Sequence, residues 1–287
     1  MLPLTRWRWP LFALLAAAVT AFAGCAGFDT LDEHQRRWIF NARPLAVAPS
    51  ADDAVGPHDV WIEHASRVTG TPVRLRGLWL PNDDPQAPVL LYLHGAGRSL
   101  DQNSYRAEHL RELGFTVLGI DYRGFGRSTA ELPSEAAVYE DARVAWEWLA
   151  QKAPGRPRYL FGHSLGGAIA IHLATEVDDA RGLIVEGTFT SIPEVFQTTK
   201  WGWLPVTALI TQRFDSIGKI DRVRAPLLVV HGSRDGLIRP QLARSLYERA
   251  RVPKRFVLVE GGTHYSTNRL GGAQYREALK ELFGLGS

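Results

Sequence analysis

One nine-residue stretch, residues 159–167, limits how this 287-residue chain can fold more than any other part of it. A short apolar run ends in Gly-His-Ser-Leu-Gly at residues 162–166, and a helical pattern follows directly. A serine on so tight a strand-to-helix turn has a strained backbone, and a glycine on each side prevents a collision across the turn. The pattern is typical of a nucleophile elbow, although a Gly-Ser turn that merely closes a strand would have the same local sequence.

Strand and helix patterns alternate along the rest of the chain. Two segments with alternating polarity, 60–64 and 73–80, are expected to form an antiparallel hairpin. Buried strands, which lack polar alternation, are expected at 88–93, 116–121, 159–161, 183–185, 227–230 and 256–259. Helices are expected at 28–41, 101–113, 134–151, 165–175, 240–251 and 273–283. This order predicts a mainly parallel, doubly wound α/β sheet with an antiparallel start.

The chain is expected to contain one large domain, since 45% of its residues are hydrophobic and no internal repeat is found. That domain is placed at residues 58–287, after an N-terminal helix and linker at 25–57. The segment 190–221 interrupts the alternation and is rich in aromatic residues, so it is expected to form a small helical cap. It is too short for a full lid domain.

Residues 1–24 are predicted to form a signal peptide. Arg6 and Arg8 precede a largely apolar run that is short for a membrane span, and Ala-Gly-Cys follows at 23–25. Small residues before a cysteine resemble a bacterial lipobox, in which Cys25 is lipidated and becomes the mature N-terminus. This predicts a lipid-anchored protein at the periplasmic side of the bacterial cell envelope. Ordinary cleavage, giving a secreted or periplasmic soluble protein, and an uncleaved anchor are the alternatives.

Polar residues gather immediately after the predicted strands. In an open α/β sheet, functional groups collect beyond the carboxyl ends of the strands. Here the strand ends are followed by His-Gly-Ala-Gly at 94–97, Asp-Tyr-Arg-Gly-Phe-Gly-Arg-Ser at 121–128, the elbow serine, Glu186, His-Gly-Ser-Arg-Asp at 231–235, and Gly-Gly-Thr-His at 261–264. A serine, an acid and a histidine therefore follow one another in chain order, each just past a strand.

With these motifs the chain resembles the α/β-hydrolase superfamily, in its serine esterase and thioesterase-like branch. The resemblance extends from about residue 60 to the C-terminus. It implies an α/β-hydrolase fold and a serine-hydrolase mechanism, but no particular substrate.

The resemblance implies that Ser164 is the nucleophile, His264 the general base and Asp235 the acid that orients the base. Asp235 lies in the loop after the penultimate strand, where the family carries its acid. Glu186, after the preceding strand, is the alternative acid, because some hydrolases carry it there.

Two backbone N–H groups, those of Ala96 and Leu165, are expected to form the oxyanion hole. Glycines on both sides of residue 96 would let that backbone approach a ligand closely. Four aromatic residues of the cap region are candidates for an acyl pocket, although they could equally pack the cap onto the sheet: Phe189, Phe196, Trp201 and Trp203.

The remaining strand-end residues are expected to be structural. Asp121 is interpreted as a loop brace with Arg123 as its ion-pair partner, while His94, His163 and His231 are expected to support the motifs that contain them. These histidines lack the carboxylate spacing of a metal site, and the single cysteine excludes an internal disulfide bond. No metal or cofactor is expected.

The sequence thus predicts a serine hydrolase that cleaves a carboxylic ester or thioester through an acyl-enzyme on Ser164. Its substrate would be a small-molecule or acyl-chain ester, or an acylated protein, and the enzyme is expected to be a monomer. A serine peptidase of the same fold and a non-catalytic envelope-binding lipoprotein are the alternatives. The small net charge of +3, without a basic run among aromatic residues, excludes nucleic acid as an expected partner.

Overall fold

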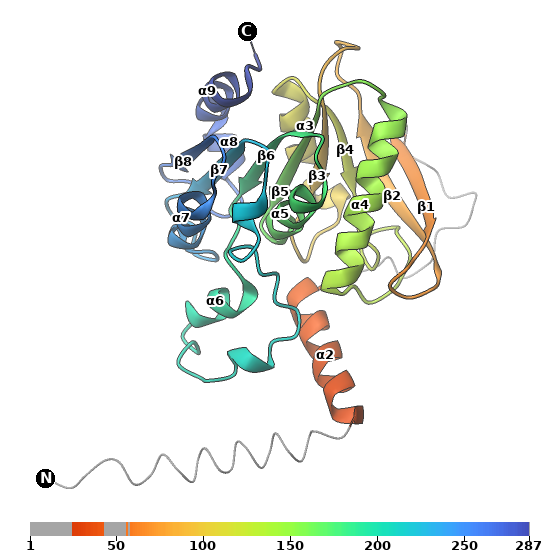
Figure 1. Cartoon of the computed structure of the whole chain (residues 1–287), viewed down its shortest axis with the longest axis vertical. Coiled ribbons are helices and arrows are strands. Elements are labelled where there is room, and N and C mark those ends of the chain that lie inside the picture. Colours follow the sequence, from red (N-terminus) through yellow and green to blue (C-terminus); the bar gives the residue numbers. More distant parts are fainter. Residues whose placement is uncertain (1–24, 43–55, 57, 287) are drawn as a thin grey trace, which may run out of the picture.

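An eight-stranded sheet forms the centre of the computed structural model, which describes residues 25–42, 56 and 58–286 (Figure 1). The strand order is β1-β2-β4-β3-β5-β6-β7-β8. β2 is antiparallel to both β1 and β4, and all the other neighbours are parallel. The strands are β1 (Asp59–Ala65), β2 (Pro72–Leu80), β3 (Val89–Leu93), β4 (Thr116–Ile120), β5 (Arg158–His163), β6 (Ala180–Glu186), β7 (Leu227–Gly232) and β8 (Lys254–Val259).

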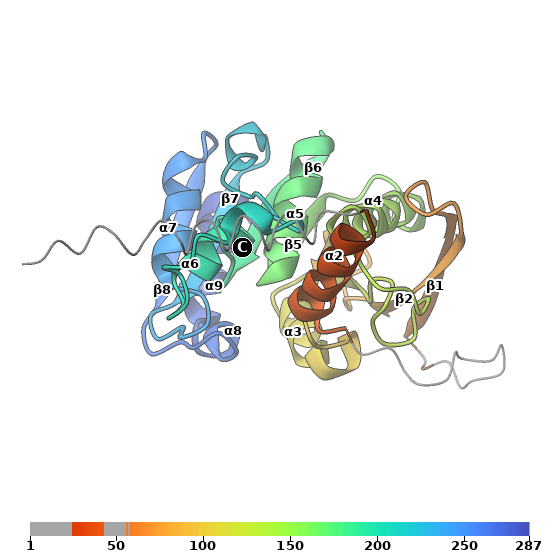
Figure 2. The same ribbon diagram turned by 90° about the horizontal axis from the view of Figure 1, so that it is seen from below.

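Helices cover both faces of this sheet (Figures 1 and 2). One face carries α3 (Leu100–Glu112), the short α8 (Thr267–Leu270) and α9 (Gly272–Phe283), and the other carries α4 (Glu135–Lys152), α5 (Leu165–Glu176) and α7 (Pro240–Arg249). The strands supply both cores because successive side chains point to opposite faces. In β3, Leu91 and Leu93 join the core under α4 and α5, whereas Leu90 and Tyr92 join the core under α3.

The structure is an α/β-hydrolase fold, so the predicted fold class is confirmed, including the antiparallel start of the sheet. The predicted strands and helices lie within a few residues of the observed ones. The four-residue helix α8 was not predicted, because one helical turn carries no periodic pattern that a sequence can reveal.

Two further elements lie together at one end of the molecule (Figure 1). They are α2 (Cys25–Phe40) and the predicted cap segment, which contains α6 (Ile192–Gln197) and the 3-10 helices η1 (Thr207–Leu209) and η2 (Ile220–Arg222). Gln35 Nε2 donates to the carbonyl oxygen of Leu209 at 2.8 Å, and Thr211 Oγ1 donates to Asp32 Oδ1 at 2.6 Å. The N-terminal helix is therefore bonded to the cap segment.

The predicted signal peptide at 1–24 lies outside the described residues, and Cys25 is the first residue of α2. Across residues 25–42, 56 and 58–286, none of the helices has both the length and the apolar character that a membrane crossing requires.

Candidate active site

Ser164 lies between the last residue of β5 and the first residue of α5. Its φ of 54° and ψ of −120° place a serine in a backbone region that side chains rarely occupy. Two hydrogen bonds between Ser164 and residues of β6 and the loop after it hold this conformation. The Ser164 N–H donates to the carbonyl oxygen of Glu186, and Thr188 Oγ1 donates to the carbonyl oxygen of Ser164, both at 2.9 Å. The predicted strained turn is present, and the serine is partly exposed to solvent.

The glycines on either side of Ser164 are required by close backbone contacts. A Cβ atom on Gly162 would overlap the backbone of Gly166, and a Cβ atom on Gly166 would overlap the carbonyl group of Leu93. A side chain on Gly162 would therefore push the start of α5 away from β5, and one on Gly166 would push it away from β3. The elbow needs both glycines for steric reasons.

His264 and Asp235 are joined by a hydrogen bond of 2.8 Å between Nδ1 and Oδ2, and both side chains are buried. The other carboxylate oxygen of Asp235, Oδ1, accepts the backbone N–H groups of Leu237 at 2.9 Å and Ile238 at 2.8 Å. The carboxylate is thus fixed on one side by its own loop and on the other by the imidazole. This arrangement can hold the histidine in a single tautomer, with Nε2 free to accept a proton.

His231 supports the same carboxylate. Its Nε2 donates to the carbonyl oxygen of Ile238 at 2.9 Å and lies 3.3 Å from Asp235 Oδ2. Burial raises the pKa of Asp235, but hydrogen bonds from His231 and His264 outweigh it and hold this pKa well below the ordinary aspartate value. The carboxyl group is therefore ionised at neutral pH.

His264 lies beside the serine elbow. Its ring centroid is 4.8 Å from that of His163, the residue before Ser164, and a Cβ atom on Gly187 would lie 3.4 Å from its Nδ1. The Ser164 hydroxyl and the His264 ring, both within the described residues, are not hydrogen-bonded to each other. Such contacts are often long in a free enzyme and shorten when substrate binds.

The alternative acid, Glu186, is bonded to other groups. Its fully buried carboxylate forms an ion pair with Arg106 and accepts a hydrogen bond from the Tyr275 hydroxyl. Its two oxygens are occupied in this way, and the described contacts of His264 Nδ1 lead to Asp235 instead. The geometry favours Asp235 over Glu186 as the partner of the histidine.

The predicted oxyanion donors lie on two backbone segments next to Ser164. A Cβ atom on Gly95 would lie only 3.0 Å from Ser164 Cβ, so the loop after β3 passes directly against the serine. Leu165 is the first residue of α5, and an N–H in the first turn of a helix has no intrahelical acceptor. The described residues likewise offer no acceptor to the Ala96 N–H. Among the described residues neither N–H group has an acceptor, so both can donate to a ligand at this position.

The four predicted pocket residues fall into two groups. Phe189 is buried and Phe196 is partly buried, whereas Trp201 and Trp203 are 52% and 75% exposed. Phe189 lies just before the cap segment and Phe196 lies on α6 within it, and both can contribute apolar surface. The two tryptophans face solvent on the cap, and their place in an acyl pocket stays a prediction.

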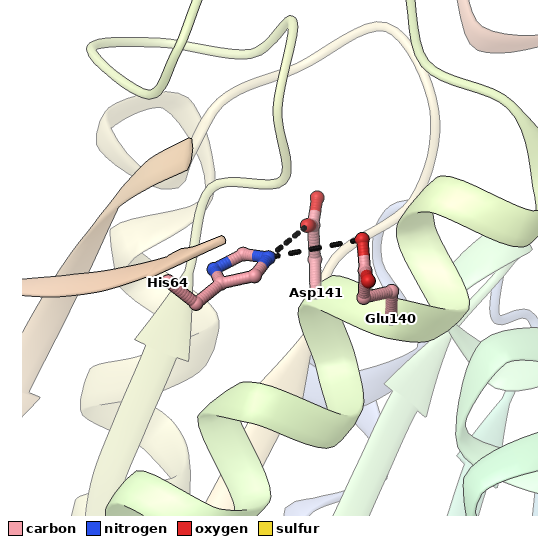
Figure 3. A group of neighbouring side chains, drawn as sticks. All are labelled: His64, Glu140 and Asp141. Carbon is pink, nitrogen blue, oxygen red and sulfur yellow. Dashed lines mark ion pairs between the residues drawn. The ribbon is translucent and has the colours of Figure 1, made fainter. Parts of the chain in front are cut away.

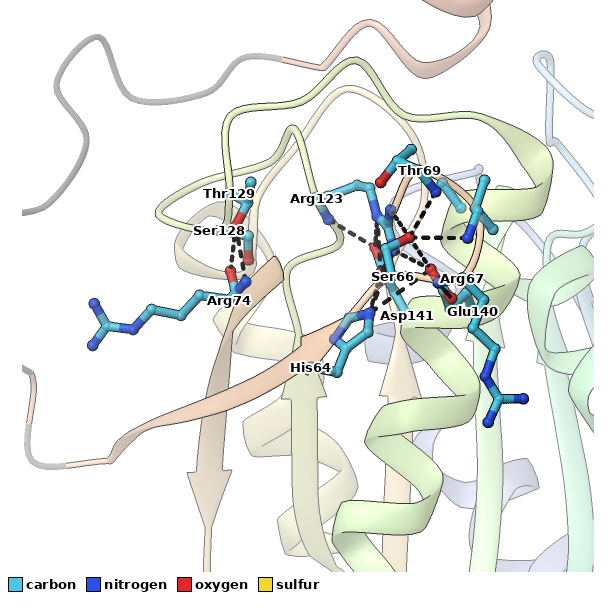
Figure 4. A network of polar contacts seen from close by, with 12 residues as sticks. His64, Ser66, Arg67, Thr69, Arg74, Arg123, Ser128, Thr129, Glu140 and Asp141 are labelled. Carbon is cyan, nitrogen blue, oxygen red and sulfur yellow. Dashed lines mark hydrogen bonds and ion pairs between the residues drawn. The ribbon is translucent and has the colours of Figure 1, made fainter. Parts of the chain in front are cut away.

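The prediction that Arg123 pairs with Asp121 is wrong. Arg123 instead bonds two residues of α4, with Nη2 2.6 Å from Asp141 Oδ1 and 2.7 Å from Glu140 Oε2 (Figure 4). Asp121 faces Arg76, whose Nη1 lies 3.4 Å from Oδ2. The two side chains leave the loop on opposite sides of the sheet, a direction that their spacing in the sequence did not reveal. The predicted role of this loop as a brace is nevertheless consistent with both sets of contacts.

One cluster among the described residues has metal-ligand side chains close together, His64, Glu140 and Asp141, with donor atoms within 4.8 Å of one another (Figure 3). The buried guanidinium of Arg123 occupies it, because Nη2 bonds both carboxylates and lies 3.5 Å from His64 Nε2 (Figure 4). The arginine already supplies the positive charge that these carboxylates need. The cluster is therefore an ion-pair network that joins β1 to α4.

The three strand-end histidines bond separate backbone groups. His94 Nδ1 faces the carbonyl oxygen of Gly95, His163 Nε2 faces that of His264, and His231 Nε2 faces that of Ile238. His94 and His231 each bond a carbonyl group of their own loop, whereas His163 bonds the loop that carries His264.

Sequence reasoning missed Arg106, which reaches beneath the histidine loop from α3. Arg106 Nη2 donates to the carbonyl oxygen of His264 at 3.3 Å while Nη1 pairs with Glu186. A signal was present, because Arg106 falls on the same helical face as the apolar Leu110. A charge on the buried face of a helix requires a buried counter-charge.

Comparison with known sequences shows a family model described as "Serine aminopeptidase, S33" that matches residues 84–218. An uncharacterized protein of Mycobacterium tuberculosis (strain H37Rv) is 33% identical over 276 residues, with 94% of each chain covered. A lysophosphatidylserine lipase of Danio rerio is 33% identical over 186 residues. That match covers 58% of this chain and 48% of the lipase, about half its length.

Solved structures share the fold. The Butyrivibrio proteoclasticus protein Est1E with bound ferulic acid has a TM-score of 0.64 at 19% identity, covering 78% of this chain and 99% of that chain. The Pyrococcus furiosus esterase Pf2001 has a TM-score of 0.64 at 20% identity, covering 84% and 100%. At these identities the likeness concerns the fold alone.

Proposed function

We propose that Ser164 forms an acyl-enzyme with a carboxylic ester or thioester. The chain belongs to the α/β-hydrolase superfamily, in its serine aminopeptidase S33 family, and is an esterase- and lipase-like serine hydrolase. The observation that carries this proposal is the buried 2.8 Å hydrogen bond between His264 and Asp235, next to a serine whose backbone is strained. Few structural roles require that combination.

In the proposed reaction, His264 Nε2 takes the proton from Ser164 Oγ as this oxygen bonds to the substrate carbonyl carbon. The carbonyl oxygen gains the electron pair and accepts hydrogen bonds from the N–H groups of Ala96 and Leu165. When the bond to the alcohol or thiol breaks, the imidazolium returns its proton to that leaving group. Asp235 stabilises the imidazolium throughout without taking its proton.

Water completes the cycle. His264 Nε2 removes a proton from the water as the water oxygen attacks the acyl carbon. The bond between that carbon and Ser164 Oγ then breaks, and Oγ receives the proton back from the imidazolium. The products are a carboxylic acid and the free enzyme.

A fluorophosphonate probe, which labels only an activated serine, tests this proposal. The wild-type protein should be labelled and should hydrolyse p-nitrophenyl esters, and the Ser164→Ala variant should do neither while keeping its circular dichroism spectrum. Equal labelling of both proteins would remove Ser164 from the mechanism. A folded wild type that is neither labelled nor active on a broad ester panel would favour the alternative of a non-catalytic binding protein.

Peptide cleavage is the second candidate activity, because the matching family model is described as an aminopeptidase. The small cap segment favours esters, since gripping a peptide usually requires a larger additional domain, and one relative is named a lipase. Turnover of aminoacyl anilides and of p-nitrophenyl esters with acyl chains of increasing length compares the two. Faster cleavage of the anilides would reverse our preference, and an optimum at long acyl chains would support a lipidic substrate.

We also propose that Cys25 carries a lipid that holds the enzyme at the cell envelope. The sequence before Cys25 supports this, and so do the exposed indoles of Trp201 and Trp203, which are side chains that favour a membrane interface. Metabolic labelling with a clickable fatty acid should mark the wild-type protein in the membrane fraction. The Cys25→Ser variant should lose the label, and a label that persists in it would exclude this site.

A further inference from the structure

Two buried side-chain donors converge on one backbone atom, the carbonyl oxygen of His264. His163 Nε2 lies 3.0 Å from this oxygen, and Arg106 Nη2 lies 3.3 Å from it. Both donor residues are almost fully buried, at 4% and 1% exposure. Solvent therefore cannot replace either bond, and the loss of a donor would leave a buried carbonyl group with fewer partners.

The first donor, His163, contacts two loops of the site at once. A carbonyl oxygen can only accept, so Nε2 must carry the hydrogen, and burial holds the pKa of His163 well below its ordinary value. The ring is therefore neutral. Its other nitrogen, Nδ1, would lie 3.3 Å from a Cβ atom on Gly95, in the loop that carries the Ala96 donor. The side chain of His163 thus lies between the loop that carries His264 and the loop that carries Gly95 and Ala96.

The second donor, Arg106, is itself held from three elements. It projects from α3, pairs with Glu186 at the end of β6, and Glu186 accepts a hydrogen bond from the Tyr275 hydroxyl on α9. The Arg106 guanidinium is planar and rigid, so fixing Nη1 on Glu186 also fixes the direction of Nη2. The carbonyl oxygen of His264 lies in that direction.

We infer that His163 and Arg106 are positioning residues that hold the backbone of His264, so that its imidazole stays directed at Ser164. Asp235 fixes the ring at Nδ1, but a hydrogen bond at one ring atom leaves the loop free to move. The bonds to the carbonyl oxygen fix the same residue at its backbone. The inference rests on the proposed function, in which His264 is the general base.

The size of the effect follows from the geometry of proton transfer. A displacement of about 1 Å between base and nucleophile can cost on the order of 10²-fold in rate. Substrate binding should be little affected, because neither donor is proposed to touch the substrate. A loss of positioning should therefore lower kcat and leave KM near its wild-type value.

Two variants of His163 separate positioning from packing. His163→Leu introduces an apolar side chain of similar size that has no hydrogen-bond donor. His163→Gln keeps an N–H at about the reach of Nε2. We expect kcat to fall by roughly 10- to 100-fold in His163→Leu, and by no more than about threefold in His163→Gln, with KM unchanged in both. Rates are expressed per serine that a fluorophosphonate probe can titrate, so unfolded protein does not count.

Arg106→Lys provides an independent measurement. Lysine keeps the positive charge that Glu186 needs, but its single ammonium group cannot reproduce the fork that also reaches the carbonyl oxygen of His264. We expect a fall in kcat of about tenfold at unchanged KM. Arg111→Lys, a partly exposed arginine on the same helix that pairs with Glu108, is the matched control and should leave kcat unchanged.

The proton shared by His264 and Asp235 reports on the geometry without any turnover. It should give a downfield NMR signal in the wild type and in His163→Gln, and a shifted or broadened one in His163→Leu. Wild-type kcat in His163→Leu, or equal losses in the Leu and Gln variants, would overturn the inference alone. A wild type without labelling or turnover would overturn the proposed function and, with it, the inference.

Discussion

The backbone of Ser164 is held in its strained form by contacts that leave no room for larger neighbours. Gly166 approaches β3 so closely that a Cβ atom there would overlap the carbonyl group of Leu93. The strain is therefore built into the contact between the start of α5 and β3. The stability of the fold and the shape of the site depend on the same atoms.

Replacing Gly166 by alanine tests this contact. We expect Gly166→Ala to lower the free energy of unfolding by about 1–3 kcal/mol, because backbone atoms on both sides would have to separate. Gly272→Ala is the control, since the nearest atom to its added Cβ would be 3.6 Å away, an ordinary contact distance. Urea unfolding followed by circular dichroism measures both, and an equal change in the two variants would contradict the steric argument.

The role of Asp235 depends on a single atom, Oδ2, which bonds His264 Nδ1. Asp235→Asn keeps the shape of the side chain, but an amide group at the position of Oδ2 would favour the wrong histidine tautomer. We expect kcat to fall on the order of 10⁴-fold, with a folded protein and a nearly unchanged KM. Steady-state kinetics on a p-nitrophenyl ester measures this. A loss below about tenfold would mean that Asp235 does not orient the base.

Among the elements, α2 reaches furthest from the hydrolase core and yet ends against the site. Phe40, its last residue, is fully buried and packs edge-to-face on Phe214 of the cap segment, with ring centroids 5.8 Å apart. The carbonyl oxygen of Phe40 accepts the N–H of Gly97 at 2.9 Å. The oxyanion loop therefore lies between Ser164 on one side and the end of α2 on the other.

We expect Phe40→Ala to destabilise the fold by about 3–5 kcal/mol through the cavity it leaves, and to lower kcat by loosening the oxyanion loop. Trp38→Ala on the same helix removes a larger side chain, but Trp38 is 71% exposed, so its effect should stay within about 0.5 kcal/mol. Thermal unfolding and kinetics of the full chain compare the two. Similar values for both variants would show that α2 does not stabilise the site.

The ion-pair network of Arg123 joins the β1–β2 hairpin to α4. Arg123 Nη1 donates to Ser66 Oγ at 3.0 Å, and Nη2 bonds Glu140 and Asp141 (Figure 4). Asp141 is fully buried, so its charge depends on this partner. The network fixes the antiparallel edge of the sheet to the helix that covers it.

Arg123→Met should therefore destabilise the protein by about 3–5 kcal/mol, because Asp141 would keep a buried and uncompensated charge. The exposed pair of Arg143 and Glu176 provides the control, since Arg143→Met should cost no more than about 1 kcal/mol. Chemical denaturation measures both free energies of unfolding. Equal costs would mean that the buried network contributes no more than a surface ion pair.

At the scale of the whole molecule, stability depends on pH through the acid of the site, because burial raises its pKa less than hydrogen bonds from His231 and His264 lower it. The pKa of Asp235 is lower in the folded protein than in the unfolded chain, so the carboxylate stabilises the fold above the unfolded value of about 3.9. This stabilisation is lost as the pH falls from there toward the folded pKa. The melting temperature of the wild type should exceed that of Asp235→Asn at pH 7, and the gap should narrow at about pH 3. A gap independent of pH would contradict the direction of the shift.

Much of the architecture was predictable because it depends on local patterns. Continuously apolar runs identified the buried strands, and the chain order of serine, acid and histidine identified the loops that carry the site. Parallel strands bring their carboxyl ends to one edge, so residues as distant in sequence as Ser164 and His264 were expected to lie near each other. Boundaries shifted by a few residues because the ends of helices and strands depend on caps and tertiary contacts.

By itself, the sequence determined the fold class, the elbow that requires Gly162 and Gly166, and the residue types available for catalysis. Only the tertiary structure decided which carboxylate bonds His264, because Asp235 and Glu186 both lie at or just past a strand end and the sequence does not show where their side chains point. The same reason explains the error at Arg123. Periodicity shows which residues are buried, whereas the partner of a buried charge depends on neighbours that are distant in the chain.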